Sequence, residues 1–253
     1  CVLYELLNPF PVTEKILCCF AVHLAEEELS HQTIKTYLAA VRDTHISLGF
    51  PDLRSTDSLP RLTKIQAGIR RVQALKGQPS RVRLPITPSI LERLRAHWSV
   101  DENGCLLWAV ASLCFFGFFR LGELLAPSSD NRSYLSWGDV SFDRAPHPSI
   151  MKVHLKTSKC DQFGTGANIF IGRSNDSICP VEACLAYIAI RGSGPGYFFR
   201  DKGGKSLLKP HFVSEVRKAL TAIGVHQESY AGHSFRIGAA TAAAAAGLED
   251  STI

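Results

Sequence analysis

The stretch from Gly104 to Phe118 constrains the fold of this chain most, because a helix over it is apolar on all sides. Such a helix has no face suited to water, so we expect it at the centre of a hydrophobic core. The longest apolar run, Leu106 to Phe119, is too short for a membrane span and has polar residues at its edges. The sequence therefore predicts a globular domain around this helix and no membrane partner.

The first 80 residues have the pattern of a separate helical domain. Ser30 is a typical N-cap, Gly49 a typical helix end, and Gly77-Gln78-Pro79-Ser80 a helix-breaking segment. Helices are expected over about residues 11–28, 30–49 and 61–75. We therefore predict one domain over residues 1–80, with a linker that reaches Arg83.

The rest of the chain mixes helices with short strands. Thr87-Pro88 is an N-cap followed by a proline at the first helical position. Helices are expected over 88–97, 104–118, 180–191, 211–223 and from 234, and strands over 134–142, 150–156 and 168–171. Residues 84–253 are therefore predicted to be an α+β domain, mainly helical, around a small three-stranded antiparallel sheet.

Charge is unevenly distributed along the chain. The formal net charge is only +5, but the segment from Arg61 to Arg83 contains no acidic residue. Its basic residues are Arg61, Lys64, Arg70, Arg71, Lys76, Arg81 and Arg83. Such a segment is either a solvated helix face with a charged linker or a surface for nucleic acid.

The eight cysteines do not indicate a metal site. Most fall in apolar helical patterns, where a free cysteine acts as a small hydrophobic residue. Cys179 and Cys184 lie across a helix start and lack nearby Cys or His partners. We predict reduced cysteines, no metal and no cofactor, since no glycine-rich nucleotide-binding loop is present either.

Four charged residues have the pattern of a phosphate-binding set. The segment AGHSFRIGAATAAAAAG places His233 and Arg236 on one face at the start of an alanine-rich helix, where backbone N–H groups suit a phosphate. The segment FFGFFRLGELL ends the apolar helix and carries Arg120 and Glu123. Lys156, in HLKTSK, lies at the end of the second expected strand.

These residue types match the needs of metal-free phosphodiester cleavage. Guanidinium groups bind two phosphate oxygens and stabilise the charge of the transition state, and a general acid protonates the leaving 5′-oxygen. Each residue also has an ordinary interpretation. Arg120 fits a helix-end surface arginine with Glu123 as its i, i+3 partner, Lys156 an edge-strand lysine, and His233 a helix cap.

Taken together, these motifs resemble the tyrosine recombinase (phage integrase) family, which cuts and rejoins DNA through a 3′-phosphotyrosine intermediate. The segment SHQTIKTYLAAVRDTHISLG looks like the family's helical core-binding (SAM-like) domain, and residues from about Leu84 onward look like its catalytic domain. The cysteine-bearing segments and the Phe-rich helix look most like versions from DIRS-type retrotransposons, a group of eukaryotic mobile elements.

The resemblance implies roles for individual residues. Arg120 and Arg236 correspond to the family's phosphate clamp, Lys156 to its strand lysine and His233 to its histidine; Lys159 competes for the lysine role. The basic segment Arg61 to Arg83 would follow the backbone of duplex DNA. The resemblance also implies a tetramer on paired sites, no cofactor, and a nuclear location in a eukaryotic element or a cytoplasmic one otherwise.

The sequence departs from the family after Arg236. The family's further His or Trp and its nucleophilic Tyr do not occur between Ile237 and Ile253. We therefore expect a chain truncated at its C-terminus that carries the phosphate-activating residues without the nucleophile. The alternatives are a non-catalytic DNA-binding protein derived from a recombinase and an unrelated helical scaffold with structural arginines.

Overall fold

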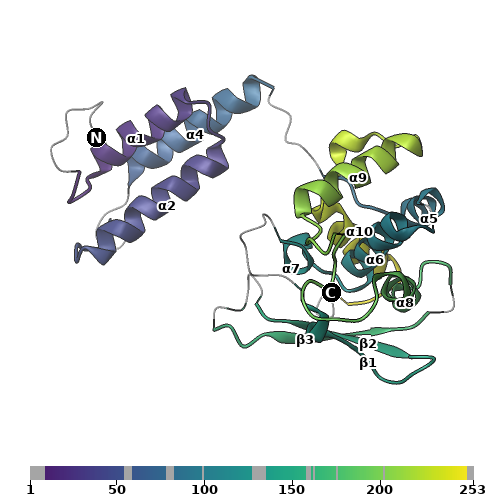
Figure 1. Cartoon of the computed structure of the whole chain (residues 1–253). Helices are drawn as coiled ribbons and strands as arrows, with labels where there is room; N and C mark the ends of the chain where they lie inside the picture. Colours follow the sequence, from purple (N-terminus) through teal and green to yellow (C-terminus); the bar gives the residue numbers. More distant parts are fainter. Residues whose placement is uncertain are drawn as a thin grey trace. The chain divides into compact units, whose positions relative to one another are not determined.

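The computed structural model describes residues 9–53, 59–77, 83–98, 100–126, 135–157, 161, 163–174, 176–201 and 203–249. The chain divides into two compact units, Cys1–Ser80 and Arg81–Ile253 (Figure 1). The core-binding and catalytic roles of residues 1–80 and 84–253 stay predictions. In the described part of the chain, no helix is long and apolar enough to cross a membrane.

The first unit is a small helical domain of α1 (Glu14–Glu26), α2 (His31–Ser47) and α4 (Pro60–Leu75). Ser30 caps α2 as predicted, because its hydroxyl accepts a hydrogen bond from the Thr33 N–H at 3.1 Å. α4 has no side-chain cap of its own. Glu14 of α1 replaces it by accepting from the N–H groups of Arg61 and Leu62 at 2.8 and 3.2 Å. This contact fixes the N-terminus of α4 against α1.

The second unit is built around α6 (Glu102–Phe116), which is buried along Gly104–Phe115. This confirms the central position expected for the apolar stretch. α5 (Pro88–His97), α8 (Pro180–Arg191) and α10 (His233–Ala245) pack around it (Figure 1). α9 (Lys209–Ala222) packs against α5. Thr87 caps α5 as predicted, accepting from Ile90 N–H at 3.3 Å.

The sheet is three-stranded and antiparallel, in the order β1 (Val140–Phe142), β2 (Ile150–Leu155) and β3 (Ala167–Gly172). Met151 and Val153 of β2 and Ile171 of β3 are buried, so these alternate residues join the core. The described cysteines, Cys18, Cys19, Cys105, Cys114, Cys179 and Cys184, are unpaired. Burial raises the pKa of Cys114 and of Cys184, as suits packing residues.

The first strand is shorter than predicted. Residues 137–139 form a 3-10 turn, η2 (Trp137–Asp139), and only 140–142 pair with β2; Tyr134 lies outside the described residues. The turn forms because the Asp139 carboxylate accepts from both the N–H and the hydroxyl of Ser136, at 2.7 and 2.5 Å. This local bonding replaces strand pairing over these residues.

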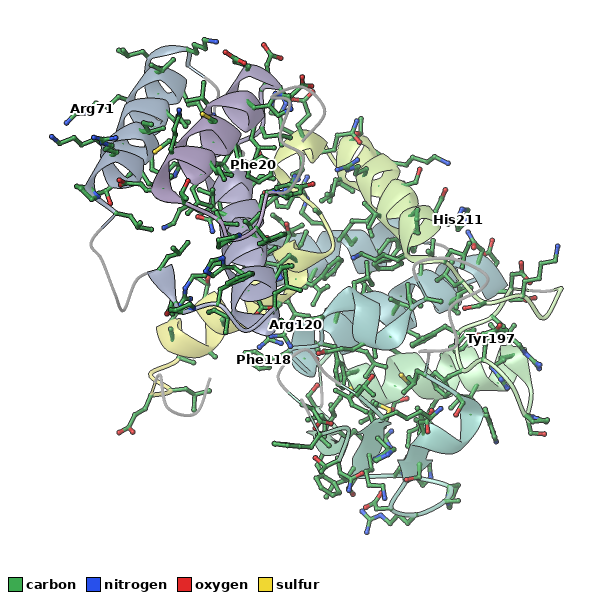
Figure 2. All side chains as sticks on the ribbon, turned by 90° about the vertical axis from the view of Figure 1, so that its left-hand side faces the viewer. Phe20, Arg71, Phe118, Arg120, Tyr197 and His211 are labelled. Carbon is green, nitrogen blue, oxygen red and sulfur yellow. The ribbon has the colours of Figure 1, made fainter. Side chains whose placement is uncertain are left out.

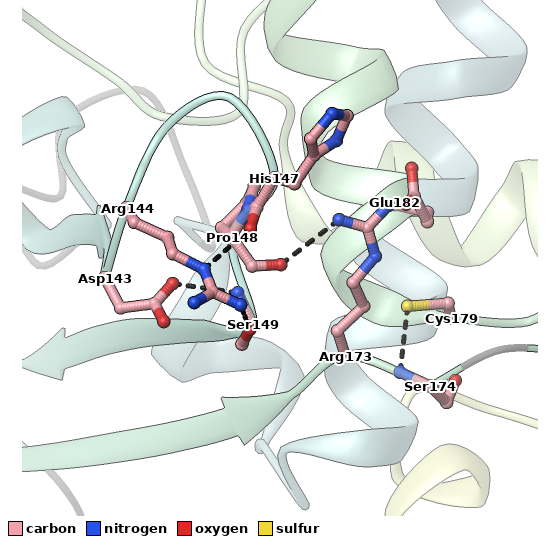
Figure 3. A network of polar contacts seen from close by, with 9 residues as sticks. All are labelled: Asp143, Arg144, His147, Pro148, Ser149, Arg173, Ser174, Cys179 and Glu182. Atoms are coloured by element: carbon pink, nitrogen blue, oxygen red, sulfur yellow. Dashed lines mark hydrogen bonds and ion pairs between the residues drawn. The ribbon is translucent and has the colours of Figure 1, made fainter.

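A polar network ties the β1–β2 hairpin to the start of α8 (Figure 3). Arg173 forms an ion pair with Glu182 and donates to the Pro148 carbonyl at 3.2 Å. The Asp143 carboxylate accepts from the N–H groups of Ser149 and Ile150 at 2.9 and 3.1 Å. These bonds lie at the end of β2 opposite Lys156, and they fix the sheet against the helices.

Candidate active site

Arg120 lies after a sharp break at the end of α6, which ends two residues earlier than the predicted Phe118. The helix ends at Phe116 with Gly117 as its C-cap, and Arg120 is the N-cap of a separate short helix, α7 (Leu121–Leu124). Phe118 has a φ of 53°, in the left-handed region that non-glycine residues rarely adopt. Such backbone strain persists only where surrounding packing imposes it, and it is concentrated at functional sites.

Packing under Gly117 explains the break. A Cβ at Gly117 would lie 2.2 Å from the ring of Phe119, which is itself 1% exposed. The Phe119 ring therefore occupies the space that a side chain at Gly117 would need. The chain turns at this point, and Arg120 emerges beside the end of the buried helix.

Glu123 forms the i, i+3 pair with Arg120 that their spacing predicted. Its carboxylate accepts from the Arg120 backbone N–H at 2.7 Å and from Nη1 of the Arg120 guanidinium at 3.0 Å. The Glu123 side chain is only 9% exposed, whereas that of Arg120 is 33% exposed. The pair therefore anchors the guanidinium on its inner side and leaves part of it toward solvent.

Arg236 reaches the same break from α10. Its Nη1 donates to the Phe118 carbonyl at 2.7 Å, a contact between residues 118 positions apart. Figure 2 shows Phe118 and Arg120 next to each other where α6 ends. The structure thus brings the two predicted clamp arginines to one short segment, Phe118–Arg120.

His233 is the first residue of α10 and is exposed. The residue before it, Gly232, packs tightly on Leu121, since a Cβ there would lie 2.6 Å from a Leu121 methyl carbon. Leu121 directly follows Arg120, so the start of α10 is held beside the start of α7. His233 therefore begins the helix that carries Arg236, as the sequence predicted. The end of α10 that it occupies is the end that lies beside Leu121.

Lys156 follows the last residue of β2 and is held by groups that we did not predict. Its Nζ forms an ion pair with Asp139 Oδ2 at 2.8 Å and donates to Ser136 Oγ at 3.1 Å. The available sequence signal was Ser136 three residues before Asp139, the spacing of a capping box. The competing Lys159 lies outside the described residues.

The Asp139 carboxylate makes part of the stability pH-dependent. Burial alone would raise its pKa, but hydrogen bonds from Lys156 and Ser136 outweigh burial and hold the pKa below its ordinary value. The carboxylate therefore contributes fully to the folding stability above about pH 4, and this contribution is lost as the pH falls through the lower folded-state pKa.

We expect Asp139→Asn to lower the melting temperature at neutral pH. The difference in melting temperature between this variant and the parent should become smaller in acid. Thermal unfolding across pH measures this, and a constant difference would contradict it.

The predicted basic residues of the first unit do not form a single stripe. Arg61, Lys64, Arg70 and Arg71 of α4 and Lys76 after it are all exposed. At about 100° per residue, Arg61, Lys64 and Arg71 share one side of α4, whereas Arg70 points about 100° away from Arg71. Arg83 belongs to the second unit and donates to the Glu228 carbonyl at 3.1 Å, and Arg81 lies outside the described residues.

A second basic surface lies on α9 and was not predicted. A pocket there is lined by Lys209, Arg217 and Lys218 together with Ser214 and Gln227. Lys218 pairs with Glu215 at 2.7 Å, and the buried Nε of Arg217 has no hydrogen-bond partner within the described residues. The spacing of Lys209, Arg217 and Lys218 along one helix was the available sequence signal.

The described residues contain no group of three or more His, Cys, Asp or Glu side chains that could hold a metal ion. Arginine, histidine and lysine side chains are suited to phosphate, because they donate several charged hydrogen bonds. The arrangement around Phe118–Arg120 can therefore bind and polarise a phosphodiester.

No family model matches this chain, whereas a curated protein and several solved structures resemble it. The "Integrase/recombinase xerD homolog" of Selenomonas ruminantium is 25% identical over 258 residues, covering 99% of this chain and 71% of that protein. Among solved structures, the Tn1549 transposon integrase in complex with circular intermediate DNA matches with a TM-score of 0.58 at 14% identity, over 96% of this chain and 76% of that one. The XerA recombinase matches with a TM-score of 0.48 at 16% identity, over 94% and 86%.

The structural match to the Tn1549 integrase concerns the fold. It agrees with the described helices and the antiparallel sheet β1-β2-β3. The predicted α+β class, mainly helical around a small three-stranded sheet, is therefore confirmed.

Proposed function

Since the chain belongs to the tyrosine recombinase and integrase family, we propose that it activates a phosphodiester of duplex DNA for strand breakage and rejoining in site-specific recombination. Arg120 and Arg236 would bind the non-bridging oxygens, and Lys156 would protonate the leaving 5′-oxygen. His233 would exchange a proton with the attacking or leaving group, or donate a hydrogen bond to the phosphate. No cofactor is needed, because the protein–DNA bond conserves the energy for rejoining.

One observation supports this proposal more than any other. The guanidinium of Arg236 is bonded to the Phe118 carbonyl, two residues before Arg120, although α10 and α6 are far apart in the sequence. Two guanidinium groups held at one strained turn provide the preorganised positive charge that a five-coordinate phosphorus requires. An arginine bonded to a carboxylate on one side, as Arg120 is, keeps its charge and its orientation.

Two of the described tyrosines do not suit the role of nucleophile. Tyr187 and Tyr230 are buried, and the Tyr187 hydroxyl lies within hydrogen-bond distance of the backbone carbonyls of residues 198 and 200. We therefore propose that the nucleophilic tyrosine is neither of these two, and that they need not be substituted in a test of phosphate activation.

A substrate that supplies its own nucleophile tests the proposal on this chain. We would select short duplexes that bind the chain and place one ribonucleotide at each position of one strand in turn. The 2′-hydroxyl then attacks the adjacent phosphorus, the P–O5′ bond breaks, and the products are a 2′,3′-cyclic phosphate and a 5′-hydroxyl. His233 or water takes the hydroxyl proton, and Lys156 supplies a proton to the 5′-oxygen.

Position-specific cleavage that requires Arg120 and Arg236 is the expected result. Binding without cleavage at any position, unchanged by substitution of either arginine, would favour the alternative of a non-catalytic DNA-binding protein derived from a recombinase. Absence of salt-dependent binding to duplex DNA would refute both, because phosphate contacts release counterions.

The basic surfaces on α4 and α9 would contact the phosphate backbone of the DNA. Such contacts position the protein and give salt dependence without sequence choice. A tetramer on paired sites, a DIRS-type mobile element as the source, and a nuclear location in that case remain further proposals, each resting on the family resemblance.

Arg217 provides a test of the α9 surface. We expect Arg217→Ala to weaken duplex binding and to reduce the slope of log K against log salt by about 1, the loss of one phosphate contact. Binding measured by fluorescence anisotropy at several salt concentrations checks this. Arg144→Ala is the charge-matched control, since Arg144 lies in the β1–β2 turn and bonds the His147 carbonyl at 3.0 Å. Equal changes in both variants would show a general effect of net charge.

A further inference from the structure

The ammonium of Lys156 has a buried partner, although half of the lysine side chain is exposed. Its side chain is 49% exposed, and that of Asp139 is 9% exposed. Exposed ion pairs contribute little, but a buried carboxylate that loses its partner is strongly destabilising. The Asp139–Lys156 pair therefore differs from an ordinary surface pair, because the carboxylate depends on the lysine.

Asp139 is itself rigidly placed. One of its oxygens, Oδ2, accepts from the Ser136 N–H, the Ser136 hydroxyl and the Lys156 ammonium. Ser136 is bridged to Tyr197, and the neighbouring Trp137 N–H donates to the Gly196 carbonyl at 2.9 Å. The guanidinium of the buried Arg191 lies over the Trp137 ring at 4.6 Å. The η2 turn is thus fixed to the loop after α8 on one side and to β1 on the other.

Ser136 and Asp139 also set the direction of the lysine. Oδ2 of Asp139 and Oγ of Ser136 both lie within hydrogen-bond distance of Nζ, at 2.8 and 3.1 Å. A lysine side chain has several rotatable bonds and loses considerable entropy when ordered. Two acceptors on one fixed turn restrict that freedom and keep the ammonium beside the end of β2.

We propose that Asp139 is a positioning residue for Lys156, holding its ammonium in place for delivery of a proton to the leaving 5′-oxygen; this rests on the proposed function. As the P–O5′ bond breaks, its electron pair remains on the oxygen, which takes one proton from Nζ. Lys156 becomes a neutral amine and is reprotonated from water. The Asp139 carboxylate stays ionised throughout and touches no reacting atom.

The first test does not depend on cleavage. Acetylation of lysine amines in the 253-residue chain is quantified for each lysine by mass spectrometry. We expect Asp139→Asn to raise the acetylation rate of Lys156 several-fold, because its hydrogen-bonded ammonium is released, and to leave Lys152 on the same strand unchanged. Asp143→Asn is the matched control, because Asp143 directly follows β1 as Asp139 directly precedes it. It should leave the acetylation rates of Lys156 and Lys152 unchanged. An unchanged Lys156 rate in Asp139→Asn overturns the proposal.

Ser136→Ala covers the case in which Asp139→Asn fails to fold. It removes one acceptor of Lys156 and keeps the Asp139 carboxylate, so it should raise the Lys156 rate by a smaller factor. Circular dichroism establishes folding of each variant. A Lys156 rate unaffected by Ser136→Ala, in a chain where Asp139→Asn does not fold, also overturns the proposal.

The second test separates positioning from a purely structural role. With the ribonucleotide-bearing duplex at saturation, Asp139→Asn should slow cleavage about tenfold or more with little change in affinity, since part of a general-acid contribution is lost. In a Lys156→Ala background the same substitution should have no further effect. Additive losses in the double variant would assign Asp139 a structural role and overturn the proposal.

The two tests also distinguish failure of the proposed function from failure of this inference. If the unsubstituted chain cleaves no duplex, phosphate activation fails, and proton delivery by Lys156 fails with it. The acetylation result then still decides whether Asp139 holds the lysine. If the chain cleaves and Lys156 acetylation is insensitive to Asp139→Asn, only the positioning role is refuted.

Discussion

Arg236→Ala is expected to slow cleavage of the ribonucleotide-bearing duplex by about 10³-fold or more, with only a small loss of binding. Guanidinium groups that stabilise charge in the transition state mainly increase the rate of cleavage. The affinity for DNA, in contrast, is the sum of many phosphate contacts, so the loss of one of them changes it little. Single-turnover cleavage at saturating protein measures the rate separately from affinity. The same variant of a longer chain that includes a nucleophilic tyrosine should lose covalent adduct formation to a similar degree.

The contact of Arg236 with Phe118 explains why this residue should matter so much. A guanidinium has five N–H donors, and the Phe118 carbonyl accepts from one of its nitrogens, Nη1. Within the described residues this bond fixes the orientation of the guanidinium relative to Arg120. A methyl group at position 236 removes the charge and also leaves the Phe118 carbonyl without its partner.

Thr241→Ala and Arg236→Lys are the matched comparisons. Thr241 lies on the same helix, is exposed, and bonds only the Ile237 carbonyl among the described residues, so its loss should leave the rate unchanged. Arg236→Lys keeps the charge but loses the planar fork, and we expect it to remain strongly impaired. If Arg236→Ala slows the reaction less than tenfold, Arg236 is not a clamp.

Local sequence patterns predicted most of the helices correctly, because their signals are contained within a few residues. Ser30 and Thr87 cap the helices that the sequence assigned to them. The range of α8, Pro180–Arg191, is the predicted one. The uniformly apolar stretch around residues 104–118 could belong only in a core, and it is there.

The end of α6 could not be predicted from its apolar pattern. Phe115, Phe116, Phe118 and Phe119 continue the hydrophobic run, so the local sign of a stop at Phe116 is Gly117 alone, a residue type common just after a helix end. The break depends on the Phe119 ring lying where a side chain at Gly117 would be. This contact depends on the side-chain position of Phe119, and beyond it Arg120 is the N-cap of α7.

The candidate site was predictable as a set of residue types and not as a geometry. The Arg120–Glu123 pair follows from their spacing of three residues. The bond of Arg236 to a carbonyl 118 positions away, and the pair of Lys156 with Asp139, depend on how separate elements pack. The catalytic roles of Arg120, Lys156, His233 and Arg236 remain predictions that the cleavage experiments test.

Gly238→Ala is expected to destabilise the second unit by about 3 kcal/mol, the upper end of the usual effect of overpacking. A Cβ at Gly238 would lie 1.8 Å from the Ile86 carbonyl oxygen and 2.7 Å from its carbon. Both atoms belong to backbone and cannot turn aside as a flexible side chain would. Thermal or urea unfolding of the chain measures the change.

Neither side of this contact has room to move. The Ile86 N–H donates to the Ser234 carbonyl at 2.9 Å, and the Ile86 side chain is fully buried. α10 also packs on α6. A displaced α10 would also carry Arg236 away from Phe118, so we expect the variant to lose cleavage even at temperatures where it remains folded.

Gly122→Ala is the control for this prediction, because it adds the same methyl group next to Arg120 with nothing within 4 Å of the new Cβ. Alanine favours a helix over glycine by up to about 1 kcal/mol, so this variant should be as stable as the parent or slightly more stable. A Gly238→Ala chain that unfolds like the parent would mean that α10 does not approach Ile86 so closely. In that case the contact between Arg236 and Phe118, which depends on the same helix position, would need direct measurement before any catalytic role is assigned to it.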